Sequence, residues 1–110
     1  RRNCPKCSDI YFPDPALLEK LGLPPSREYV QGTGCEHCTR TGFRGRVGIF
    51  EVVRTTPDIR RMISSGAKID DIRRVASSLG AESLRADACR RVLDQETTVE
   101  EVLRVTAEQD

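Results

Sequence analysis

The sequence predicts an α+β fold that is mostly helical: a small tetracysteine lobe with one helix, one apolar strand, and then a compact bundle of about four short helices. Three observations predict this fold. Two CxxC pairs lie in a segment rich in Pro, Gly and aromatic residues, at residues 1–45. An apolar run follows at residues 47–53, and from residue 56 onward apolar side chains recur at the spacing of amphipathic helices. We therefore expect two units, a tetracysteine lobe at residues 1–45 and a strand plus C-terminal helical subdomain at residues 46–110.

The first unit contains the signals of one short helix. Asp14 is a good N-cap with Pro15 at the first helical position, and Gly22 is typical of a helix end. The helix would present Leu17, Leu18 and Leu21 on one face. Residues 29–30 favour a short extended piece before the second cysteine pair. A unit of about 40 residues rarely folds alone without a metal or a covalent cross-link.

Residues 47–53 are the best strand candidate in the chain. Apolar side chains alternate on both faces, which is typical of a strand covered on both sides. One face has Val47, Ile49 and Val53, and the other has Phe50 and Val52. The 110 residues offer little sheet to pair with this strand, so we expect a partner sheet in sequence outside the chain. Glu51 interrupts the run, and because a buried carboxylate needs a partner, we expect it to pair with an arginine.

Four helices are predicted after the strand, each with one apolar face. Thr56 is a good N-cap for the first, Gly66 follows its end, and Gly80 follows the end of the second. Thr98 and Glu101 have the spacing of a capping box at the start of the last helix. The apolar faces consist of Ile59, Met62 and Ile63; of Ile69, Ile72, Val75, Ala76 and Leu79; of Leu84, Ala88, Val92 and Leu93; and of Val102 and Leu103. We expect these helices to form one compact bundle.

Composition and charge argue against several classes of protein. The formal net charge is +1, whereas a chain that binds nucleic acid usually has a strong basic excess. No apolar stretch approaches the roughly 20 residues that span a bilayer, and no signal peptide is visible. The sequence has no Ser/His/Asp grouping and only one histidine, so we expect no catalytic site in it. Arginine at position 1 indicates an excerpt of a longer protein, or a processed one.

Four of the five cysteines form two CxxC pairs, Cys4 with Cys7 and Cys35 with Cys38. A two-residue gap lets both sulfur atoms of a pair reach one metal ion. Two such pairs complete a tetrahedral site of four sulfur atoms, which is typical of structural zinc and leaves no open catalytic position. We therefore expect one structural zinc ion bound by these four residues. The alternative is two unrelated pairs or one redox CxxC, but the chain lacks the βαβ context of thioredoxin-like motifs.

Two further residues have side chains that bind metals. His37 lies inside the second pair and could replace a cysteine as ligand, but with four thiolates available we expect it beside the site. Cys89 is expected to be a small buried residue near the apolar face of a helix.

A loop rich in glycine and arginine follows the second pair. Arg40, Arg44 and Arg46 could contact phosphate groups, and the glycines would allow close backbone approach. Neither GxxxxGK[ST] nor GxGxxG is present, so no phosphate motif supports that role. We favour a turn-rich exit from the metal site whose arginines pair with carboxylates. The alternative is a stand-alone zinc module that binds nucleic acid through residues 40–48. Chaperone-type cysteine-rich domains also have CxxC followed by glycine, but they repeat CxxCxGxG units, and this chain has two pairs only.

Taken in order, these motifs resemble a known family. They are CPKC at 4–7, GCEHC at 34–38, TGFRGRVGIFE at 41–51, SLRAD at 83–87 and TTVEEVLRVT at 97–106. They resemble the tetracysteine region and the C-terminal signature of type II secretion and type IV pilus assembly ATPases, over nearly the whole chain. The four paired cysteines match the zinc ligands of that family position by position. Lys68 stands where the family often has a capping Ser or Thr, and Ala88 where it often has glycine.

The resemblance implies a parent protein that is a cytoplasmic, ring-forming hexameric ATPase at the periphery of the inner membrane. It would dock on platform proteins there, and ATP hydrolysis would drive pseudopilus or pilus assembly. This chain would be its C-terminal structural and interaction region, joined to the motor core of the same polypeptide. ATP and Mg²⁺ would bind in the parent only, so the chain alone should not hydrolyse ATP, and no nucleic-acid partner is expected.

Overall fold

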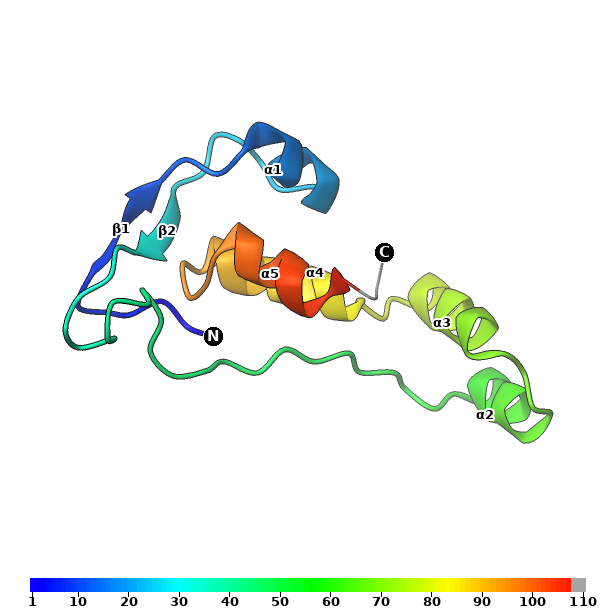
Figure 1. Ribbon diagram of the computed structural model, residues 1–110. Coiled ribbons are helices and arrows are strands. Elements are labelled where there is room, and N and C mark those ends of the chain that lie inside the picture. The colour runs from blue at the N-terminus through cyan, green and yellow to red at the C-terminus, as the bar shows by residue number, and fades with distance from the viewer. Residues whose placement is uncertain (108–110) are drawn as a thin grey trace.

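The computed structural model describes residues 1–107, in which one two-stranded antiparallel sheet and five helices are formed (Figure 1). The elements in chain order are β1 (Ser8–Tyr11), α1 (Pro15–Leu21), β2 (Tyr29–Gly32), α2 (Pro57–Ser64), α3 (Ile69–Ser78), α4 (Leu84–Leu93) and α5 (Val99–Val105). The predicted class, α+β and mostly helical, is confirmed.

Helix α1 begins and ends where its capping residues predict. The side chain of Asp14 accepts a hydrogen bond from Ala16 N at 2.9 Å, and Gly22 takes the left-handed conformation at φ +70°. The extended piece predicted at residues 29–30 belongs to β2, which pairs with β1 so that Tyr29 lies opposite Tyr11. Strand β1 was not predicted, because its side chains are mostly exposed and show no apolar alternation.

Residues 47–53, predicted as a strand whose partner sheet lies outside the chain, form no strand within residues 1–107, where they have no sheet partner. It runs as an irregular stretch along the molecule towards α2 (Figure 1). A strand needs a neighbour to satisfy its backbone N–H and C=O groups, and β1 pairs with β2 elsewhere. Ile49 packs against the core, whereas Phe50 and Val52 have exposed fractions of 64% and 75%. Val53 is also exposed, with an exposed fraction of 36%, so the segment has uncovered apolar side chains on both faces.

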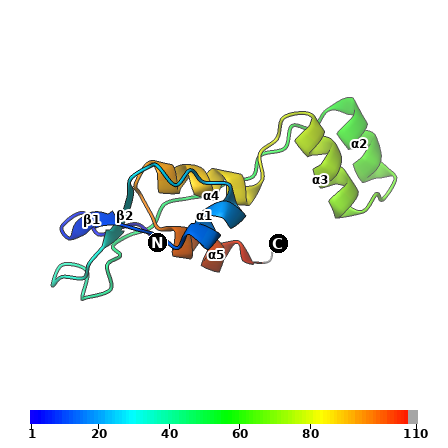
Figure 2. The same ribbon diagram turned by 90° about the horizontal axis from the view of Figure 1, so that it is seen from above.

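The four helices after residue 53 form as predicted, but the expected compact bundle is wrong. Helix α2 packs with α3, and α4 packs with α5. Both views place the α2–α3 pair at the end of the molecule away from the β1–β2 hairpin (Figures 1 and 2). The reason is that α4 and α5 bury their apolar faces against the N-terminal part. The shared core consists of Leu18, Leu23, Tyr29, Ala88, Cys89, Val92, Val99 and Val102.

Three of the helix starts in the C-terminal part have a side-chain cap. The hydroxyl groups of Thr56, Ser83 and Thr98 accept hydrogen bonds from the backbone N–H three residues further on, at 3.1–3.3 Å. Lys68, at the start of α3, provides no side-chain hydrogen bond. Helix α3 therefore lacks the cap that stabilises the other three helices.

Candidate metal centre

The sulfur atoms of Cys4, Cys7, Cys35 and Cys38 lie together, all within 4.8 Å of one another. The Sγ–Sγ distance is 3.7 Å between Cys4 and Cys35, 3.8 Å between Cys7 and Cys38, and 3.7 Å between Cys35 and Cys38. All four are free thiols rather than disulfides. The structure thus brings together every residue that the sequence predicts as a metal ligand.

These distances fit a tetrahedral metal site. Zinc–sulfur bonds of about 2.3 Å at the tetrahedral angle separate neighbouring sulfur atoms by about 3.8 Å. Four soft sulfur donors in this geometry suit zinc or iron and leave no position open for water or substrate. The four-cysteine cluster could therefore hold one metal ion.

The β1–β2 hairpin explains how two pairs so far apart in sequence meet. Cys4 and Cys7 lie just before β1, and Cys35 and Cys38 lie just after β2. The register sets Ser8 opposite Gly32, so the start of one strand lies beside the end of the other. Because the hairpin brings both pairs to one end of the sheet, the long gap that contains α1 does not hinder the site.

Backbone N–H groups point at two of the sulfur atoms. Gly34 N donates to Cys7 Sγ at 3.3 Å, and both Cys35 N and Gly42 N donate to Cys38 Sγ at 3.2 Å. Burial raises the pKa of Cys38, but the two backbone hydrogen bonds, together with the side-chain hydrogen bonds of Cys35 and Cys7, outweigh it and lower the pKa to about 6. Hydrogen bonds of this kind stabilise the thiolate, which is the form that binds a metal.

Cys4 has the opposite shift, because burial raises the pKa of its thiol to about 11. Metal ligation requires deprotonated sulfur, so a metal ion would have to displace the proton of Cys4. Binding by the four-cysteine cluster is therefore expected to release protons and to weaken as the pH falls.

Two glycines let the chain cross itself beside the cysteines. A Cβ atom added to Gly42 would lie 2.4 Å from Gly32 O, and one added to Gly32 would lie 2.0 Å from Gly42 O. Gly42 also has φ +80°, a conformation that favours glycine. Since Gly42 N donates to Cys38 Sγ, this close crossing helps to place the cluster.

The other candidate residues of the sequence lie outside the cluster. Among residues 1–107, the group able to hold a metal consists of the four cysteines, and His37 is not part of it. His37 is half-buried, and its carbonyl accepts a hydrogen bond from Arg44 Nη1 at 3.0 Å. Cys89 is buried in the core on α4, as predicted.

The expectation that the loop arginines pair with carboxylates is wrong within residues 1–107, where Arg40, Arg44 and Arg46 have no such partner. Arg44 donates to the His37 carbonyl instead, because the tight turns keep the loop close to its own backbone. The turn-rich exit itself is present, with positive φ at residues 39, 40, 42 and 45. The partner expected for Glu51 is confirmed, since Arg73 Nε lies 3.8 Å from Glu51 Oε1.

A buried cluster of charged side chains that includes Arg1, three residues before Cys4, was not predicted from the sequence. Glu101 on α5 has an exposed fraction of 4% and accepts hydrogen bonds from both Arg1 and Arg104. Burial raises the pKa of Glu101, but the two guanidinium groups, together with the N-terminal ammonium group, outweigh it and lower the pKa to about 2. Its place in the capping box offered an ordinary explanation for a glutamate here. The pairing with Arg1 joins opposite ends of the sequence, and no local pattern predicts it.

None of the helices in the described part of the chain is long and apolar enough to cross a lipid bilayer.

Comparison with known proteins shows what the chain is related to. It is similar to the type IV pilus assembly ATPase PilB of Thermus thermophilus, with 37% identity over 98% of this chain and 13% of that protein. It is also similar to type II secretion system protein E of Pseudomonas aeruginosa, with 39% identity over 96% of this chain and 21% of that protein.

A further relative is type II secretion system protein E of Pectobacterium carotovorum, with 37% identity over 99% of this chain. The chain spans 22% of that relative, and thus about a fifth or less of the length of all three. Residues 1–104 match the family model described as "Type II/IV secretion system protein". This chain therefore belongs to the type II/IV secretion system protein family.

Proposed function

We propose that this chain is the C-terminal structural and interaction region of a hexameric traffic ATPase that powers type II protein secretion or type IV pilus assembly. The match of residues 1–104 to the family carries this proposal. The parent would work in the cytoplasm at the periphery of the inner membrane, against platform proteins of the secretion or pilus machine. ATP and Mg²⁺ would bind in the parent only, since the 110 residues contain no GxxxxGK[ST] motif.

We further propose that Cys4, Cys7, Cys35 and Cys38 hold one structural zinc ion. The sulfur spacing and the N–H groups aimed at Cys7 and Cys38 support this assignment. Zinc bound here would cross-link the chain that enters β1 to the chain that leaves β2. It would have no open coordination position for a reaction. The division into a zinc-binding lobe at residues 1–45 and a helical subdomain at residues 46–110 stays a prediction.

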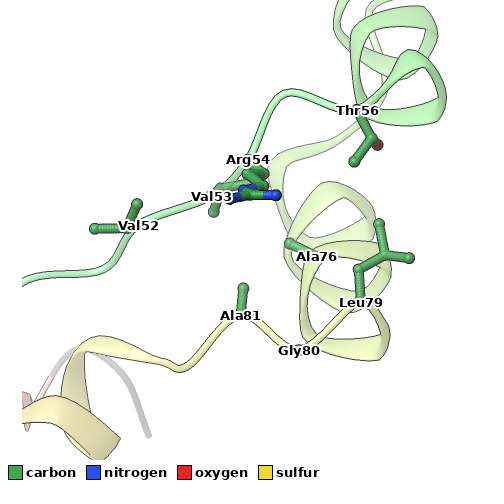
Figure 3. A pocket seen from close by; sticks show the side chains of 8 residues that line it. All are labelled: Val52, Val53, Arg54, Thr56, Ala76, Leu79, Gly80 and Ala81. Carbon is green, nitrogen blue, oxygen red and sulfur yellow. The ribbon is translucent and has the colours of Figure 1, made fainter.

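An uncovered apolar strip supports an interaction role. Phe50 and Val52 project from the irregular segment at residues 47–53, and Leu79 at the end of α3 is also exposed. Val52, Val53, Arg54 and Thr56 face the end of α3 across a cavity of about 500 Å³ that Ala76, Leu79, Gly80 and Ala81 also line (Figure 3). Exposed apolar side chains that lie close together are common in protein interaction sites, which supports the proposal.

The occupant that we propose for this strip is the motor core of the same polypeptide. The relatives are several times longer than this chain, so most of such a polypeptide lies outside it. Phe50 N already donates to Asp87 Oδ2 at 2.8 Å. A sheet edge in that core would satisfy the other backbone groups of residues 47–53 and cover Phe50 and Val52 together.

The test compares the chain with a longer polypeptide that includes the residues upstream of it. We expect ATP hydrolysis by the longer polypeptide only. Backbone amides of residues 47–53 other than Phe50, whose N–H donates to Asp87, should exchange with solvent rapidly in the chain and slowly in the longer polypeptide. ATP hydrolysis by the chain itself, or none by the longer polypeptide, would contradict the ATPase assignment. Equally rapid exchange in both would contradict the motor core as occupant of the strip.

A further inference from the structure

The residues that lead into Cys4 are held on one side by the chain that leaves the metal centre. Asn3 forms an antiparallel bridge with Phe43. The backbone hydrogen bonds of this pairing are Arg2 N to Gly45 O at 3.0 Å, Arg44 N to Arg2 O at 2.9 Å, and Cys4 N to Gly42 O at 2.9 Å. Any displacement of residues 1–3 would therefore disturb both the first and the second cysteine pair.

On the other side, the same residues contact the turn between α4 and α5. Asn3 N donates to Glu96 O at 2.8 Å, and Asn3 Nδ2 donates to Gln95 O at 3.2 Å. The hydroxyl group of Thr97 donates to Arg1 O at 2.7 Å. The start of the chain is thus inserted between the metal centre and the C-terminal helix pair.

The Arg1 side chain completes this insertion. Its guanidinium group lies 4.3 Å from the centre of the Phe43 ring, and its Nη2 donates to Glu101 Oε2 at 2.8 Å. Arg104 donates to the same carboxylate, but it lies one turn further along α5 and is not part of the segment before Cys4. The N-terminal ammonium group of Arg1 also lies 3.5 Å from Glu101 Oε1. The buried carboxylate is therefore bound by cationic groups of two residues, of which only Arg1 leads to the metal centre.

We propose that Glu101 is a positioning residue of the metal centre, acting through Arg1 to hold the segment that carries Cys4. This inference rests on the proposed zinc site. Metal binding must order residues 1–4, and a segment already fixed by Glu101 loses less conformational entropy when the metal binds. Coupling is reciprocal, so the bound metal also strengthens the contact between Arg1 and Glu101.

The test is a competition between the full chain and a chelator, at neutral pH with the thiols kept reduced. It measures the affinity of the chain for zinc and the rate at which zinc is released. Two variants weaken the link. Glu101→Gln removes the carboxylate charge, and Arg1→Gln removes the guanidinium group but leaves the N-terminal ammonium group 3.5 Å from Glu101 Oε1. Arg104→Gln is the matched control, because it also removes one arginine from Glu101 but leaves Arg1 in place. We expect zinc affinity to fall about fivefold or more in the first two variants and to stay unchanged in the control.

Arg1→Gln leaves Arg104 on the carboxylate, so α5 keeps a neutralised Glu101 and the fold is preserved even if Glu101→Gln is poorly folded. Wild-type affinity in Arg1→Gln would overturn the inference while leaving the zinc site intact. An equal loss in Arg104→Gln would overturn it too, because the effect would then follow the stability of α5 alone. No zinc binding by the wild-type chain would instead overturn the proposed site, and the inference with it.

Discussion

Gly32 and Gly42 show how closely single residues constrain the metal centre. Their backbones cross so tightly that a Cβ on either would meet the carbonyl oxygen of the other. Gly45, three residues after Gly42, has nearly the same positive φ, at +77° against +80°, but a Cβ atom added to it would meet no other atom within 4 Å. The two positions therefore separate the cost of the backbone conformation from the cost of the close crossing.

The first prediction uses this pair in the zinc-saturated chain. Gly45→Ala should cost about 1–2 kcal/mol of unfolding free energy, from the left-handed conformation alone. Gly42→Ala should cost about 3 kcal/mol or more, because the clash with Gly32 adds an overpacking penalty. Urea unfolding monitored by circular dichroism would measure both. Equal losses in the two variants would show that the crossing does not matter.

The residue scale also shows what the sequence could predict of the site. The four cysteines were predictable because a CxxC pair is a local motif whose chemistry depends on a two-residue gap. The partnership of Arg1 with Glu101 was not, because it depends on how the hairpin and α5 come together. Gly42 was visible only as one glycine among several, since its role depends on Gly32 on the other side of the site.

At the scale of elements, α3 is the helix with a weak start. Lys68 provides no side-chain hydrogen bond, and its positive charge lies at the positive end of the helix dipole. The second prediction is that Lys68→Ser stabilises the chain by about 0.5–1 kcal/mol. The matched change Thr56→Ala at the start of α2 should destabilise it by a similar amount, because it removes an existing cap. Thermal unfolding of both variants would measure this; a Lys68→Ser variant with an unchanged or lower midpoint would contradict it.

The elements also show where local patterns succeed and where they fail. Helix ends were predictable because Asp14, Gly22 and Thr98 act on their own backbone neighbours. The conformation of residues 47–53 was not predictable in the same way. Alternating apolar residues indicate that a sheet could cover the segment, but they do not show whether a partner sheet is present. Strand β1 is the converse case, formed by pairing with β2 despite exposed side chains.

At the scale of the molecule, the core joins the two ends of the chain rather than the four C-terminal helices. Tyr29 of β2 packs with Val92 of α4 and Val99 of α5 in one cluster. Tyr11 adds a polar link, since its hydroxyl group accepts a hydrogen bond from Val99 N at 3.1 Å. The metal centre therefore lies at one end of a body that includes both termini of the described chain, and the α2–α3 pair extends from the other end (Figure 1). Helical periodicity identified the helices, but it contains no information on which apolar faces meet.

The four paired cysteines are proposed to bind one structural zinc ion. Zinc binding contributes about 10–16 kcal/mol in small modules, enough to control the order of the N-terminal part. Elemental analysis combined with native mass spectrometry, on chain purified under reducing conditions, tests the claim most directly. We predict one zinc ion per chain, lost in Cys38→Ser and retained in the control Cys89→Ser, whose thiol lies in the core. A wild-type chain without zinc and with two disulfides, or a Cys38→Ser variant that retains a full equivalent of zinc, would contradict the claim.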